Sequence, residues 1–147
     1  MGDSLVRLHR LFGNEVRAEY YVDDMGKQVG VLAWALAHLS EADVNTTLNG
    51  RDGLNPKWKG KADHERVRWY QAAQVVRQER EDKEAIEQES GRMVHASEHG
   101  DQGVLDQFEA AYQPVLDGML MTLARLGIEF DTFTKESMFV TLSLIHI

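Results

Sequence analysis

The chain has 147 residues, no cysteine and a formal net charge of −8, from 24 acidic and 16 basic side chains. This length fits one domain or a piece of a larger protein and excludes a complete multidomain enzyme, while the lack of cysteine excludes disulfides, thiolate metal sites and a cysteine nucleophile. The acidic balance argues against a surface that attracts nucleic acid as a whole, so any such contact needs a local basic patch or further domains.

The first predicted elements are a helix, a strand and a second helix. Residues 4–12 carry apolar side chains at helical spacing, and this pattern is already running close to Met1. Residues 15–23 alternate apolar and polar side chains, as a strand with one buried face does. Residues 25–39 return to the helical period. Helix, strand and helix in this order are half of a parallel α/β unit.

The middle of the chain is predicted to be mostly helical. Residues 40–61 are polar and rich in turn signals, which predicts a loop, and residues 63–98 permit helix. Residues 104–126 have the strongest amphipathic pattern in the chain, in which Pro114 marks either a kink or the start of a second helix. We expect a short strand at residues 136–141.

A first candidate site lies where the predicted strand gives way to the next helix. Ligands of parallel α/β sheets bind beyond the carboxyl ends of the strands. There Asp24 could meet a cationic group, Gly26 would let backbone approach closely, and Gln28 can both donate and accept hydrogen bonds. The alternative is that Asp24 only caps the helix, which requires no ligand.

A second candidate is Glu136, a lone carboxylate that enters an apolar segment between Phe133 and Met138. A carboxylate in such a segment either stays at the surface or pairs with a cation, and a guanidinium offers the best bidentate partner. His95 and His99 share a helix face, but no third ligand accompanies them. We therefore expect a solvated histidine pair and no metal site.

The residues around both candidates carry a family resemblance. Residues 2–8, 15–28, 126–131 and 136–137, which read GDSLVRL, EVRAEYYVDDMGKQ, LGIEFD and ES, resemble class I arginyl-tRNA synthetases of the archaeal type. The resemblance runs from residue 2 to about residue 140. It implies an α/β fold, namely an internal fragment of a Rossmann-like catalytic domain that is mostly helical by residue count.

The resemblance also implies a division of the chain. Residues 1–39 and 128–141 would belong to the catalytic core, and residues 40–127 would form a helical insertion. Residues 142–147 depart from the family and match the translation of a transposase adaptor used for sequencing libraries, so we expect a non-native tail. The family's helix at residues 2–12 begins upstream with a His-x-Gly-His motif, which would make Met1 an internal methionine or a truncated start.

The implied activity is ATP-dependent ligation of arginine to tRNA, with Mg²⁺ accompanying ATP, in the cytoplasm and without membrane contact. By resemblance, Glu136 receives the guanidinium of the substrate, Asp24 and Gln28 belong to the amino-acid pocket, and Tyr21 walls it. Asp23, where relatives often carry Gly or Asn, adds charge near the pocket. The His-x-Gly-His and Lys-Met-Ser-Lys motifs are not in residues 1–147, so we expect no catalytic residues in this chain and no activity of the chain alone.

Two alternatives stay open at this point. One is a stand-alone acidic helical module that binds a partner through residues 104–126; it predicts a stable domain without a sheet. The fragment interpretation predicts instead an unpaired strand at residues 16–22 and exposed apolar surface. The other alternative is a different class I synthetase or related nucleotidyl transferase, which would have no need for Glu136.

Overall fold

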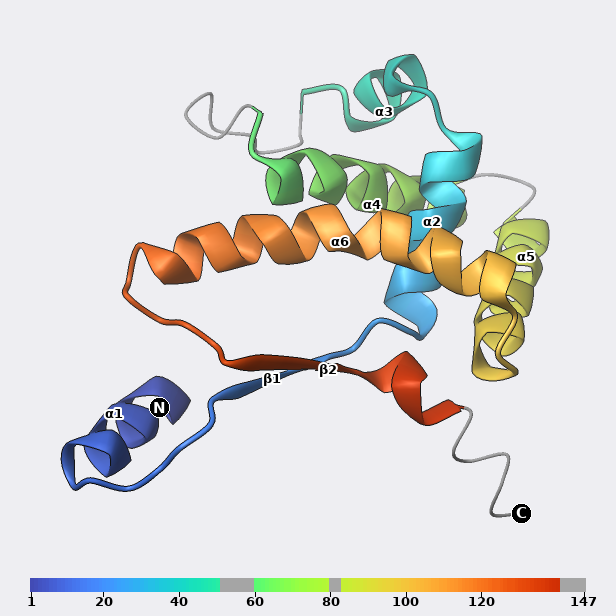
Figure 1. Cartoon of the computed structure of the whole chain (residues 1–147). Helices are drawn as coiled ribbons and strands as arrows, with labels where there is room; N and C mark the ends of the chain where they lie inside the picture. The colour runs from blue at the N-terminus through green and yellow to red at the C-terminus, as the bar shows by residue number, and fades with distance from the viewer. Residues whose placement is uncertain (51–59, 80–82, 141–147) are drawn as a thin grey trace.

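The computed structural model describes residues 1–50, 60–79 and 83–140, which form six α-helices, two strands and a short 3-10 helix within these ranges (Figure 1). In chain order the elements are α1 (Gly2–Leu11), β1 (Glu19–Val22), α2 (Lys27–His38), α3 (Glu41–Leu48), α4 (Ala62–Glu79), α5 (Lys83–Glu98), α6 (Gln102–Ala124), β2 (Thr132–Lys135) and the 3-10 helix η2 (Glu136–Phe139). The chain is therefore mostly helical with a small parallel sheet, consistent with the α/β expectation.

The sheet joins the two ends of the described chain. β1 and β2 run parallel, with Glu19 opposite Thr132 at one end of the ladder and Val22 opposite Lys135 at the other. The predicted first strand is confirmed over its second half, but the expectation that it is unpaired is wrong. The sheet also contradicts the alternative of a stand-alone helical interaction module, which predicted a domain without a sheet.

The prediction of a strand at residues 136–141 is wrong, because the second strand, β2, lies immediately before this segment. β2 ends at Lys135, and Glu136–Phe139 form η2. The physical reason lies at Ser137, whose backbone N–H donates to the carboxylate of Asp24 at 2.9 Å instead of extending the ladder. Residues 141–147, including the predicted tail, lie outside the described ranges.

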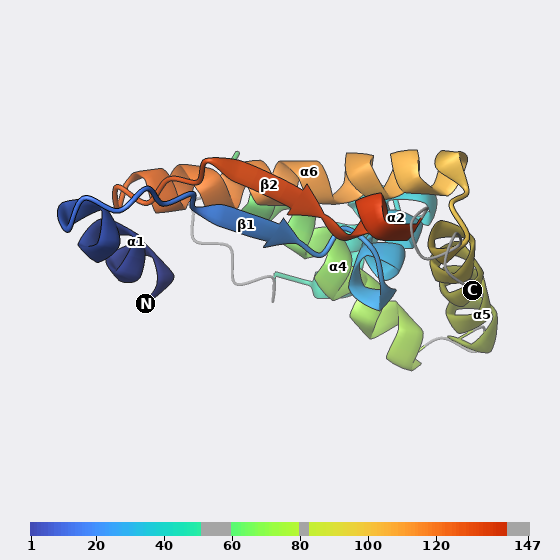
Figure 2. The ribbon, with the colours of Figure 1, turned by 60° about the horizontal axis from the view of Figure 1, so that its bottom comes forward.

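Helix α2 is the centre of the helical layer, because α4, α5 and α6 all pack against it (Figure 1). Every residue from Val29 to Ala35 is buried. One side of α2, with Trp34, packs into a core with α3, α4 and α5, while the other side packs with Val22 of β1 and Phe108 of α6. In Figure 2 β2 lies in front of α6 and β1 in front of α4, so the sheet meets the helical layer on one face.

The helix predictions are confirmed in part. The helices expected at residues 4–12, 25–39 and 104–126 correspond to α1, α2 and α6, and α6 is a single helix that contains Pro114, so Pro114 does not start a second helix.

The predicted loop at residues 40–61 is wrong at its start, where α3 forms. Ser40 and Asp43 make a reciprocal capping box that satisfies the first free N–H groups of this helix. Residues 51–59 lie outside the described ranges. The helix permitted at residues 63–98 is present as α4 and α5, with residues 80–82 between them also outside the description.

Helix α1 is attached through its polar side and leaves its apolar side in solvent. Arg10 donates to the carboxylate of Asp131 at 2.7 Å, and Arg7 donates to the carbonyl of Gly127. Leu11 and Phe12 are 81% and 75% exposed. The expected exposed apolar surface is therefore present. Within the described ranges no helix has the length and apolar character to cross a membrane.

Candidate functional site

The two strands bring their following residues together at one edge of the sheet. The ladder ends with Val22 opposite Lys135. Continuing this register by one and two residues places Asp23 beside Glu136 and Asp24 beside Ser137. Successive residues after β1 face opposite sides, so Asp23, which contacts Glu136, and Asp24, which contacts Ser137, lie on opposite faces. The exposures agree, since Tyr21 is 55% exposed whereas Val22 and Asp24 are each 4% exposed.

On the face toward the helices, Asp24 holds Ser137. One oxygen of the Asp24 carboxylate accepts the backbone N–H of Ser137 at 2.9 Å, and the other accepts its hydroxyl at 2.6 Å. Asp24 does not cap α2, whose N-cap is Gly26 with no side-chain hydrogen bond. The helix-cap interpretation of Asp24 is therefore wrong. Gly26 has φ of +98°, a conformation that an L side chain rarely adopts.

On the opposite face, Tyr21, Asp23 and Glu136 form an acidic group. Partial burial raises the pKa of Glu136 above its usual value, and the neighbouring carboxylates of Asp23, Asp24 and Glu98 raise it further. The same surroundings raise the pKa of Tyr21, through partial desolvation and then the charges of Glu136, Asp23 and Asp24. Like charges this close favour the binding of a cation, which would relieve their repulsion.

A cavity of about 270 Å³ lies beside Asp24 and Ser137, between the strand ends and α6. Lys135 lines this cavity. Its ammonium contacts the carboxylate of Glu109 at 2.5 Å and lies 5.8 Å from the ring centroid of Tyr112. The hydrogen bond to Glu109 raises the pKa of Lys135, which keeps its ammonium charged. No role was predicted from the sequence for Lys135, Tyr112 or Ser137, because no local pattern connects α6 with the end of β2.

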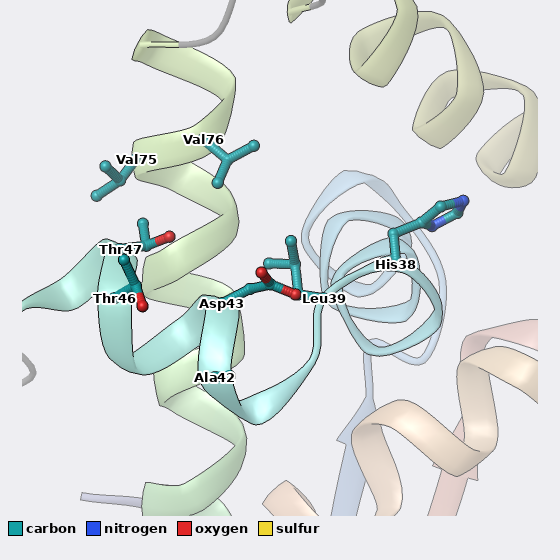
Figure 3. A pocket seen from close by; sticks show the side chains of 8 residues that line it. All are labelled: His38, Leu39, Ala42, Asp43, Thr46, Thr47, Val75 and Val76. Atoms are coloured by element: carbon teal, nitrogen blue, oxygen red, sulfur yellow. The ribbon is translucent and has the colours of Figure 1, made fainter.

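A larger hollow of about 500 Å³ lies elsewhere, where α2, α3 and α4 meet (Figure 3). Its walls carry Thr46, Thr47 and Val75, while the imidazole of His38 points away from the other lining side chains (Figure 3). None of the predicted site residues lines this hollow. The carboxyl ends of the strands are the better candidate, because the predicted residues converge there and ligands of parallel sheets bind at such edges.

The remaining predicted residues are not brought into the acidic group. Gln28 is exposed on the first turn of α2, and among the described residues no hydrogen bond joins it to Asp24 or Glu136. His95 and His99 stack on each other with ring centroids 4.1 Å apart. In the described parts of the chain, no cluster of three or more His, Cys, Asp or Glu side chains could hold a metal ion.

Comparison with known proteins gives a consistent set of relatives. The chain is 36% identical over 140 residues to a protein of Methanocella arvoryzae, 33% over 140 residues to one of Methanosphaerula palustris and 32% over 142 residues to one of Halorubrum lacusprofundi. Each of these relatives is named arginine–tRNA ligase. The matches cover 95% of this chain but only 22–23% of each relative. No family model and no solved structure matches the chain.

Proposed function

Because the chain belongs to the arginine–tRNA ligase family, matching less than a quarter of each relative's length, we propose that it supplies part of the arginine-binding site of such an enzyme. The observation that carries this proposal is the convergence of Tyr21, Asp24 and Glu136 at the carboxyl ends of two parallel strands. Asp24 and Ser137 are 113 residues apart in the chain, so only the fold assembles this edge.

In the proposed site Glu136 receives the guanidinium of arginine. A planar guanidinium donates two parallel hydrogen bonds to one carboxylate, whereas the ammonium of lysine cannot match both oxygens in the same geometry. Partial burial and then the surrounding carboxylates raise the pKa of Glu136, and a bound guanidinium would favour its ionised form. Tyr21 forms a wall of this pocket, Asp24 supports its floor, and Gln28 lies at its helical border as a polar group for the substrate.

The whole enzyme would join arginine to tRNA with ATP as co-substrate and Mg²⁺ accompanying the ATP. ATP supplies the activated phosphate that arginine's carboxylate attacks, and this chain's residues bind and orient the amino acid. We infer that β1 and β2 belong to a Rossmann-like sheet of the class I type, and that the ATP motifs and most tRNA contacts lie in other segments. This role places the enzyme in the cytoplasm, where tRNA is charged.

A hybrid enzyme tests the proposal. Residues 2–140 of this chain replace the homologous segment of the Methanocella arvoryzae ligase, and arginine-dependent ATP–pyrophosphate exchange is measured. Charged hydrogen bonds contribute about 1.5–3 kcal/mol, so Glu136→Gln should raise the KM for arginine about 10- to 150-fold. The KM for ATP should stay unchanged. Glu129→Gln, the same substitution at an exposed position, is the matched control and should leave both constants unchanged.

Two results would contradict the proposal. An unchanged KM for arginine in the Glu136→Gln hybrid would remove Glu136 from the pocket and favour another synthetase specificity. Arginine-dependent exchange catalysed by the purified 147-residue chain would show that it needs no other segment for activation, whereas we expect no activity from the chain alone.

A further inference from the structure

The segment that carries Glu136 is anchored on both sides. Before it, the ammonium of Lys135 contacts Glu109 at 2.5 Å and lies beside the ring of Tyr112. After it, Ser137 donates its backbone N–H and its hydroxyl to Asp24. Both neighbours of Glu136 are thus held toward the helical layer. Lys135 ends β2 and Ser137 lies in the single turn of η2, so these anchors fix the backbone on both sides of Glu136.

Of the two anchors, the one at Asp24 is better suited to fix a direction. Asp24 is 4% exposed, and each of its oxygens accepts one of the two hydrogen bonds from Ser137. One of these bonds constrains the backbone immediately after Glu136, and the other constrains the side chain of the same residue. A buried carboxylate that lost these donors would be left unsatisfied, which is costly, so the contact persists.

The same geometry argues against direct contact between Asp24 and the substrate. Tyr21 and Glu136 belong to the acidic group on one face of the strand ends, whereas Val22 and Asp24 face the core. A guanidinium seated on Glu136 would therefore lie on the other side of the backbone from Asp24. Each oxygen of Asp24 moreover already accepts a hydrogen bond from Ser137.

We propose that Asp24 is a positioning residue for arginine binding, which through Ser137 fixes the direction of the Glu136 carboxylate without contacting the substrate. This inference rests on the proposed function of Glu136. It gives Asp24 a different role from that of a pocket ligand. It also assigns a role to Ser137, which entered the family resemblance only as the neighbour of Glu136.

The test uses the hybrid enzyme that carries residues 2–140, with L-arginine as the probe and nuclear magnetic resonance as the readout. Asp24→Asn and Ser137→Ala should each weaken arginine binding about tenfold, because each removes a hydrogen bond to a charged acceptor. The double variant should bind no more weakly than the worse single variant, since both act through one contact. Ser137→Thr keeps the hydroxyl and should retain the unmodified affinity.

A matched control is available at the other end of the sheet. Asp131 accepts the backbone N–H of Ala18 at 2.6 Å and a hydrogen bond from Arg10 at 2.7 Å, so it also joins the two strand segments. Asp131→Asn should leave arginine binding unchanged. A spectroscopic signature comes from the side-chain carboxyl of Glu136: in Ser137→Ala its titration midpoint should fall toward that of an exposed glutamate, while in Ser137→Thr it should not.

The outcomes separate this inference from the proposed function. Unchanged arginine affinity in Glu136→Gln, or no arginine binding by the unmodified hybrid enzyme, would refute the proposed function. If Glu136→Gln abolishes binding while Ser137→Ala keeps full affinity and the native Glu136 midpoint, the positioning role alone is refuted. Weakened binding in Asp24→Asn with native affinity in Ser137→Ala would make Asp24 a direct ligand. Should Asp24→Asn fail to fold, the two Ser137 variants decide.

Discussion

Replacing Gly30 by alanine should destabilise the protein, against the usual preference of helices for alanine. Gly30 is buried in α2, where the helix meets α5 and α6. A Cβ atom added there would lie 2.8 Å from Cγ2 of Val94 and 3.6 Å from Cζ of Phe108. Carbon atoms pack best at about 3.5–4.0 Å, so only the Val94 contact is too close.

The magnitude follows from two opposing contributions. Alanine in place of glycine inside a helix stabilises by about 0.8–1.0 kcal/mol. Overpacking of a core costs typically about 1–3 kcal/mol, and the stiff β-branched Val94 should put Gly30→Ala toward the upper end. The net loss should be about 1–2 kcal/mol. Removing Cγ2 with Val94→Ala should reverse the sign, so that Gly30→Ala then stabilises by up to about 1 kcal/mol.

Urea unfolding followed by circular dichroism measures these free energies. Gly91→Ala is the matched control, because Gly91 lies inside α5 with nothing within 4 Å of an added Cβ. It should stabilise by about 1 kcal/mol. If Gly30→Ala stabilises the unmodified protein as Gly91→Ala does, or if Val94→Ala leaves its effect unchanged, the packing described for α2 and α5 is wrong.

Three further predictions concern stability. The pKa of Glu136 is raised in the folded state, so the stability that its protonated form contributes is present at low pH and is lost as the pH rises above the ordinary pKa of 4.5. Glu136→Gln should therefore be more stable than the unmodified chain at neutral pH. Urea unfolding midpoints from pH 4 to 8 measure this, and a less stable variant would contradict it. Phe108→Ala should cost about 3–5 kcal/mol in the same unfolding assay, since Phe108 is fully buried, and a loss below about 1 kcal/mol would contradict its place in the core. Ser40→Ala should lower the free energy of unfolding by about 1 kcal/mol, because it breaks the capping box with Asp43. The double variant that also carries Asp43→Asn should lose the same free energy as Ser40→Ala alone, since both substitutions break one shared contact.

The sequence predicted the elements whose signal is local. The helices α1, α2 and α6 follow from apolar spacing, and β1 follows from alternation. Helix α3 escaped prediction because its main signal is the pair Ser40 and Asp43 in a polar segment full of turn residues. The second strand was placed too late, because its end is set by the hydrogen bonds of Ser137 to Asp24.

The sequence could predict which residues belong to the candidate site, but it could not predict the role of each. Asp24 is near a helix start, so the local sequence could not separate a cap from a buried anchor whose partner lies 113 residues away. Glu136 stood out because it enters an apolar segment, and it does lie among other carboxylates. The contact of Lys135 with Glu109 joins a strand to a distant helix, and no sequence period indicates it.

The assignment of Glu136 to the arginine pocket depends on selective binding of a guanidinium. L-Citrulline has nearly the shape of L-arginine but an uncharged side chain, so a titration of the hybrid enzyme with each ligand isolates the contribution of Glu136. L-Arginine should bind about 10- to 150-fold more tightly than L-citrulline, with signals of Tyr21 and Glu136 shifting on saturation, and Glu136→Gln should abolish this preference. Equal binding of the two ligands, or a preference that survives in Glu136→Gln, would contradict the account.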